Sequence, residues 1–137
     1  MKRASVLFGV LSSIVLVAGC SEESASAIPE LSVERAAAMF EAGEAVAVDA
    51  NGASTRQEHG IVPGARLLTS SGSYDPAAEL PADHSTALVF YCGNTDCRAS
   101  DGAAERAREA GYTNVNILRA GIAGWVEAGH RVDRPQS

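Results

Sequence analysis

The segment YCGNTDCRAS, residues 91–100, contains two of the three cysteines of the 137-residue chain. Cys92 directly follows the apolar run TALVFY, and Cys97 comes five residues later, beside Arg98. A thiolate is a nucleophile and a metal ligand, and two thiols can also close a disulfide. The segment therefore offers three chemistries, namely a loop nucleophile, a disulfide or a metal clip.

The metal interpretation lacks ligands. A closed zinc site needs four, commonly two Cys/His pairs, and Cys92 and Cys97 have no second pair. The three histidines, His59, His84 and His130, show no ligand spacing. We therefore expect no metal site.

The elements around the segment predict where its side chains lie. Apolar runs at 45–49, 86–91 and 114–118 are typical of buried strands, and residues 65–68 favour another short strand. An amphipathic helix is expected at 31–44, with Ser32 to cap its start, Gly43 to end it, and Val33, Ala36, Ala37 and Phe40 on one face. A second is expected at 99–112, with Ala103, Ala104, Ala107 and Ala110 on one face. Two short helices are expected near 55–59 and at 120–130. Strands alternating with helices predict an α/β domain with a central, mostly parallel sheet flanked by helices.

This arrangement favours Cys92 as the reactive residue. Ligands of such sheets bind beyond the carboxyl ends of the strands, where Cys92 lies. The next helix turns its N-terminus toward the same loop, and its amides and dipole favour negative charge. We therefore expect a lowered pKa for the Cys92 thiol and a role as nucleophile or persulfide carrier. A buried structural cysteine at a strand end is the alternative.

The chain from Leu31 to Asp133 resembles a rhodanese domain. VAVDA, ending near Asp49, and GIVPGA, residues 60–65, match two early motifs of that family, with Ile61 where a histidine is usual. VFYC matches the strand before the catalytic cysteine. The stretch AAERAREAGYTNVNILRAGIAGWVEAGHRV matches the order of motifs at the family's end.

The resemblance implies a sulfurtransferase without a cofactor. Cys92 would take sulfane sulfur from a small anion such as thiosulfate, hold it as a persulfide and pass it to a thiol or cyanide. The loop amides of Gly93, Asn94, Thr95, Asp96 and Cys97 would form the cradle for that anion, with added charge from Arg98. Asp49 is expected to brace the loop as a hydrogen-bond acceptor, with Arg56 as a partner, and Arg119 is a further candidate at the mouth of the site.

The loop departs from the usual family pattern. Its first serine, Ser100, comes eight positions after Cys92 instead of six, so the loop is two residues longer. Relatives with wider loops include phosphatases and arsenate reductases that use C-x5-R, and Cys92 to Arg98 has that spacing. Arginine would hold an oxyanion through a fork of N–H donors. Asp96 argues against a dianion in this loop.

Cys97 is the second departure. Its attack on a persulfide at Cys92 would expel hydrosulfide and leave a disulfide, so Cys97 is a candidate resolving thiol. A thiol-disulfide redox enzyme and a catalytically silent rhodanese module that binds a partner therefore remain alternatives to sulfur transfer.

The first twenty residues predict export. Lys2 and Arg3 precede an apolar run that ends in VAGC, the order of a signal peptide, and this ending resembles the lipobox of bacterial lipoproteins. We expect a signal peptide at 1–19, a lipid anchor on Cys20 with a flexible tether to residue 30, the rhodanese-like domain at 31–133 and a short tail at 134–137. The protein would lie in the bacterial cell envelope, anchored by lipid outside the cytoplasm. In a Gram-negative cell, we expect it on the outer membrane, facing the periplasm. The net charge of −6 argues against a nucleic-acid partner.

Overall fold

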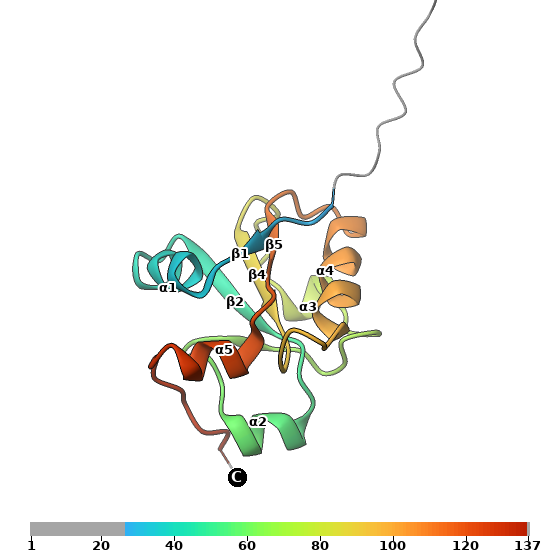
Figure 1. Ribbon diagram of the computed structural model, residues 1–137. Helices are drawn as coiled ribbons and strands as arrows, with labels where there is room; N and C mark the ends of the chain where they lie inside the picture. The colour runs from blue at the N-terminus through green and yellow to red at the C-terminus, as the bar shows by residue number, and fades with distance from the viewer. Residues whose placement is uncertain (1–26, 137) are drawn as a thin grey trace, which may run out of the picture.

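The structure, a computed structural model, describes residues 27–136 and consists of a parallel sheet with helices on both faces (Figure 1). The strand order is β1-β5-β4-β2-β3, and every pair of neighbours is parallel. In chain order the elements are β1 (Glu30–Leu31), α1 (Val33–Glu41), β2 (Ala45–Asp49), α2 (Ala53–His59), β3 (Arg66–Leu67), α3 (Pro76–Glu79), β4 (Ala87–Tyr91), α4 (Ala99–Glu109), β5 (Val115–Leu118) and α5 (Gly121–Glu127). The predicted α/β fold with a parallel central sheet is confirmed.

Strand β4 is the centre of the sheet because all five of its residues are buried and it pairs with β2 on one side and β5 on the other. Its side chains alternate between two core layers. Leu88 and Phe90 pack in the layer beneath α4, whereas Val89 and Tyr91 pack in the layer beneath α1 and α5. Cys92 continues this alternation and belongs to the α4 layer.

The two longest helices bury small side chains. In α4, Ala103, Ala104 and Ala107 are fully buried, so the helix backbone can approach the sheet closely. Ala110 was expected on the same face, but it is exposed because the helix ends at Glu109. In α1, which the Ser32 side chain caps as expected, Met39 is buried and Phe40 lies only partly buried against Trp125.

Two short elements differ from the expectation. Residues 28–30 were assigned to the tether, yet Ile28 packs against the core, Pro29 O accepts a hydrogen bond from Ile117 N–H, and Glu30 opens β1. Helix α3 lies in a stretch that was expected to be mostly loop. Asp75 is its N-cap residue, and Pro76 is its first residue. Neither element is long enough to show a hydrophobic period in the sequence.

The chain changes direction at the middle of the sheet. It runs from β2 outward to β3, returns past β2 to β4, and then continues to β5 on the opposite side. The connections that leave the carboxyl ends of β2 and β4 therefore diverge, and such a switch point is where parallel sheets bind ligands. Cys92 follows β4 at this point.

Among the residues that the structure describes, no helix is long and apolar enough to cross a membrane. The predicted signal peptide and the lipid anchor at Cys20 lie outside the described residues.

Candidate active site

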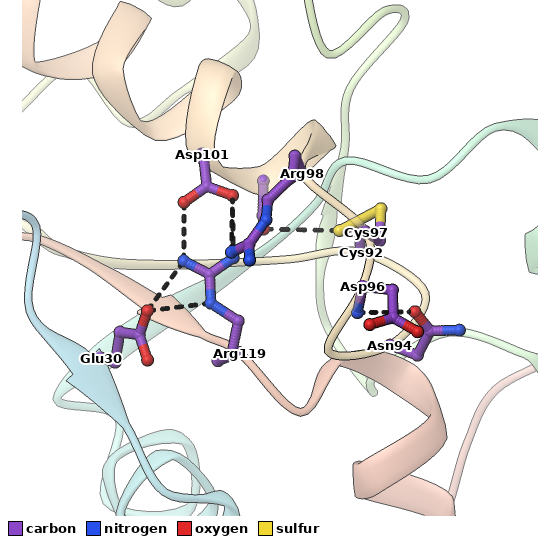
Figure 2. A network of polar contacts seen from close by, with 9 residues as sticks. Glu30, Cys92, Asn94, Asp96, Cys97, Arg98, Asp101 and Arg119 are labelled. Atoms are coloured by element: carbon purple, nitrogen blue, oxygen red, sulfur yellow. Dashed lines mark hydrogen bonds and ion pairs between the residues drawn. A yellow bond between two sulfur atoms is a disulfide. The ribbon is translucent and has the colours of Figure 1, made fainter.

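Cys92 lies at the carboxyl end of the central strand with only 2% of its surface exposed. Its sulfur forms a disulfide with Cys97, and the two Cα atoms are 6.3 Å apart (Figure 2). Cys97 is partly buried, so the two residues differ in their exposure to solvent. Within residues 27–136, no group of three or more His, Cys, Asp or Glu side chains is placed to hold a metal ion.

The loop between the cysteines forms a turn in which Asn94 is the hydrogen-bond acceptor. The Cys97 N–H donates to Asn94 O at 3.1 Å, and the Asp96 N–H donates to Asn94 Oδ1 at 3.0 Å. Two of the amides expected to form the anion cradle are therefore used inside the loop in this disulfide form. The turn they make directs Cys97 back to Cys92.

Ser100 lies against the reactive sulfur. Its Oγ is 3.4 Å from Cys92 Sγ, and the residue is 1% exposed. Since a disulfide sulfur carries no hydrogen, the hydroxyl is the donor. Ser100 lies in the first turn of α4, whose N-cap residue, Arg98, makes no side-chain capping hydrogen bond within the described part of the chain. The sulfur thus faces a helix N-terminus and a hydroxyl donor, both of which stabilise negative charge.

A buried polar network supports the loop from the β2 side. Asp49, which is fully buried, accepts hydrogen bonds from the Asn51 N–H at 2.7 Å and from the Tyr91 hydroxyl at 2.6 Å. Arg56 Nε lies 3.3 Å from Asp49 Oδ1, which is the pairing expected from the sequence. The Tyr91 oxygen in turn accepts from the Val62 N–H at 3.1 Å. Burial, together with the Asp49 carboxylate, raises the pKa of Tyr91 well above its ordinary value, so the phenol remains a donor.

Asn51 is a candidate that the sequence did not single out. Its Nδ2 is buried and has no hydrogen-bond partner among the described residues. The side chain lies beside the loop, since Asn51 Oδ1 is 4.0 Å from the position that a Cβ on Gly93 would occupy. A buried donor without an acceptor is costly, which makes this amide available to an anion held by the loop. Its place two residues after the carboxyl end of β2 is the only signal that the sequence offered.

Helix α5 supports the loop from the other side. The Ile122 and Ala123 N–H groups donate to the carbonyl oxygens of Cys92 and Gly93 at 2.9 and 3.0 Å. Gly121 has φ +64°, and a Cβ there would lie 2.7 Å from Cys92 O. Glycine is therefore required at this position by both its backbone conformation and the closeness of the loop.

The two arginines near the loop point away from the disulfide (Figure 2). Arg119 forms a bidentate pair with Asp101, at 2.8 and 2.6 Å, and also contacts Glu30 at 2.8 Å. This pairing holds the pKa of the Asp101 carboxyl below its ordinary value. Arg98, whose side chain is 69% exposed, lies 3.9 Å from Asp101. Arg119, which directly follows β5, thus links Glu30 of β1 to Asp101 of α4. Neither arginine contacts the sulfurs (Figure 2).

These features define an α/β domain with a disulfide-bonded cysteine at the switch point of a parallel sheet, facing a helix N-terminus. The rhodanese-like domain model matches residues 32–128, and the chain belongs to the rhodanese-like domain family. No curated protein sequence matches the chain.

Solved structures support the family. A thiosulfate sulfurtransferase from Pseudomonas aeruginosa is 28% identical with a TM-score of 0.62, over 80% of this chain and 21% of that one. The human single-domain sulfurtransferase is 24% identical with a TM-score of 0.57, over 72% of this chain and 96% of that one. A Rhodopseudomonas palustris protein of unknown function, described as a possible tyrosine phosphatase, is 23% identical with a TM-score of 0.63, over 77% and 85% of the two chains. The latter two likenesses show the fold alone.

Proposed function

We propose that this chain is a sulfurtransferase that carries sulfane sulfur as a persulfide on Cys92. The observation that supports this most is the surroundings of the Cys92 sulfur, which is nearly buried at the end of β4 and lies 3.4 Å from the Ser100 hydroxyl at the start of α4. A persulfide is an anion at neutral pH, and this position offers a donor and a helix dipole to it. The family supports the same chemistry.

The reaction has two steps, which is the usual form of covalent catalysis. In its reduced form, the Cys92 thiolate attacks the outer sulfur of a donor such as thiosulfate, a new S–S bond forms, and sulfite leaves with the electron pair of the bond that breaks. An acceptor thiolate or cyanide then attacks the outer sulfur and releases the Cys92 thiolate. Ser100 and the buried Asn51 amide are the donors that we expect to contact the transferred sulfur.

An oxyanion enzyme of the C-x5-R kind is the second sequence hypothesis, and the position of Arg98 does not favour it. A bound tetrahedral dianion needs the guanidinium above the nucleophile. Arg98 is instead largely exposed and lies near Asp101 (Figure 2). Sulfur transfer needs no such clamp, because the transferred sulfur carries a single charge.

The test is thiocyanate formation from thiosulfate and cyanide by the chain after reduction of its disulfide. Wild type and Cys97→Ser are expected to form thiocyanate, whereas Cys92→Ser is expected to lose at least about 1000-fold in rate, since the covalent intermediate cannot form. Thiocyanate formation that survives in Cys92→Ser would rule out the proposed role of Cys92.

The place of action is also a proposal. The order of a basic start, an apolar run and VAGC supports a lipid anchor at Cys20 and a location outside the cytoplasm. Outside the cytoplasm, the natural substrates of the protein would be a small sulfur-containing anion and a thiol acceptor.

A further inference from the structure

The Cys92–Cys97 disulfide joins the nucleophile of the proposed function to a residue of its own loop. The loop reaches this state with its turn intact, because Asn94 accepts the N–H groups of both Asp96 and Cys97. We expect the same turn in the reduced protein, where it would hold Cys97 close to Cys92. A simple transfer cycle at Cys92 has no use for this second thiol.

We infer that Cys97 resolves the Cys92 persulfide, which gives the domain a second activity, the reductive release of hydrosulfide from sulfane sulfur. The inference rests on the proposed persulfide. The Cys97 thiol gives its proton to the outer sulfur of the anionic persulfide, and the Cys97 thiolate so formed attacks the inner sulfur, Cys92 Sγ. The bond between Cys92 Sγ and the outer sulfur breaks, the Cys92–Cys97 bond forms, and the outer sulfur leaves as HS⁻ with its proton and the electron pair. The sulfane sulfur is reduced and the two cysteines are oxidised.

The disulfide observed here is the product of that step, and it must be reduced before the next turnover. The difference in access decides where a reductant attacks. Cys92 is 2% exposed and Cys97 is partly exposed, so an incoming thiolate reaches Cys97 Sγ. The leaving group is then the Cys92 thiolate, which the Ser100 hydroxyl and the α4 N-terminus stabilise. A stabilised leaving thiolate speeds exchange.

This order of attack indicates the class of reductant. The first thiol of the reductant forms a mixed disulfide on Cys97, while Cys92 is free as a thiolate. A second thiol on the same reductant then releases Cys97 and leaves the reductant as an internal disulfide. Two thiols of the reductant thus supply the two electrons that the hydrosulfide carried away. A dithiol completes both steps in one encounter, so it is the class of reductant that we expect.

The test is a single turnover without external thiol. Wild type, Cys97→Ser and Cys92→Ser are reduced, freed of reductant under nitrogen and given one equivalent of thiosulfate; released sulfide and intact mass are measured. Wild type should release about one sulfide per chain and show the mass of the disulfide form. Cys97→Ser should instead keep one added sulfur and release less than about a tenth as much sulfide. Cys92→Ser should do neither.

The outcomes separate the two proposals. If Cys97→Ser gains sulfur and wild type keeps its added sulfur without releasing sulfide, the resolving role is wrong and sulfur transfer stands. If wild type and Cys97→Ser release sulfide equally, Cys97 is not the resolving thiol. If neither chain gains or releases sulfur, the persulfide itself is wrong, and this inference is wrong with it.

The order of reduction has its own test. The oxidised wild-type chain is treated briefly with 2-mercaptoethanol, quenched with iodoacetamide and fragmented in the mass spectrometer. We expect the mercaptoethanol adduct on Cys97 and the alkyl group on Cys92. The reverse placement would overturn this order of attack, since the incoming thiolate would then have attacked the buried residue.

Discussion

At the scale of the residue, the Cys92 sulfur depends on side chains from distant parts of the chain. Ser100 contacts it from α4, and Asn51 lies beside the loop from the end of β2. Tyr91, its neighbour in sequence, points to the opposite face of the sheet and bonds to Asp49. Cys92 thus lies where the paired strands β2 and β4 end side by side.

The Tyr91 hydroxyl is expected to contribute to stability. In Tyr91→Phe, the buried Asp49 carboxylate loses one donor and the Val62 N–H loses its acceptor. Groups left unpaired in this way cost about 1–3 kcal/mol each, so we expect a loss of about 2–6 kcal/mol in the free energy of unfolding, measured with urea. Tyr112→Phe is the matched control, because its hydroxyl bonds only to partly buried backbone carbonyls and should lose about 1 kcal/mol. Equal losses in the two variants would contradict this account of the Asp49 network.

The residues that were found from the sequence are those next to strand ends. Cys92 follows the most apolar run, and Asp49 ends another, so strand prediction alone places both at one edge. Ser100 and Asn51 were given no role, because their contacts depend on the path of a loop and on the approach of a helix, and neither has a periodic pattern. Arg119 and Arg98 were considered as neighbours of the site, and the structure pairs both of them with Asp101 of α4.

At the scale of the element, the N-termini of α4 and α5 meet the loop from two sides. Helix α4 faces the sulfur, whereas α5 donates hydrogen bonds to the carbonyl oxygens of Cys92 and Gly93. This contact is possible because Gly121 leaves room for the loop backbone.

Two glycines with similar φ angles separate strain from contact with the loop. Gly121→Ala and Gly129→Ala both place a side chain at positive φ, which costs about 1–2 kcal/mol. Only at Gly121 does the new Cβ also meet the loop, whereas it meets nothing within 4 Å at Gly129. We therefore expect both variants to lose stability, and Gly121→Ala alone to lose at least about tenfold in thiocyanate formation, because the nucleophile is displaced. Equal activity in the two folded variants would show that α5 does not position the loop.

The Asp101–Arg119 pair predicts a pH dependence. Since the pKa of Asp101 is lowered in the folded protein, its contribution to stability is present above the ordinary Asp pKa of about 3.9 and is lost as the pH falls through the lower folded value. The carboxylate is 38% exposed, so solvent screening limits the contribution to the order of 1 kcal/mol. Urea unfolding of wild type and Asp101→Asn should differ by this amount at pH 6, and the difference should shrink as the pH falls below the ordinary Asp pKa. A constant difference across that range would contradict it.

The long elements and the short β3 and α2 were predicted from the sequence, whereas β1 and α3 were not. The strands β2, β4 and β5 and the helices α1, α4 and α5 all show the apolar period of their type over four or more residues. Strand β1 has two residues, and its pairing depends on β5, which is distant in sequence. Predicting β1 would therefore require knowing that β5 has a free edge with which these two residues can pair.

At the scale of the whole molecule, the proposed anchor places the disulfide loop where disulfides persist. We expect the chain to be labelled by a fatty acid in a bacterial host and recovered with the membrane fraction. Cys20→Ala should lose the fatty-acid label and should not be processed at residue 20. Cys97→Ser, the control, should be labelled and processed like wild type. Labelling that survives in Cys20→Ala, or recovery of the unaltered chain without label, would contradict a lipid anchor.

The central claim is that Cys92 holds transferred sulfur, and intact mass spectrometry of Cys97→Ser tests it most directly. This variant removes the partner that would otherwise close the disulfide, so a persulfide can accumulate after thiosulfate is added to the reduced chain. We predict a mass gain of one sulfur atom, which cyanide removes as thiocyanate. An unchanged mass, or the same gain when Cys92→Ser is combined with Cys97→Ser, would contradict the account.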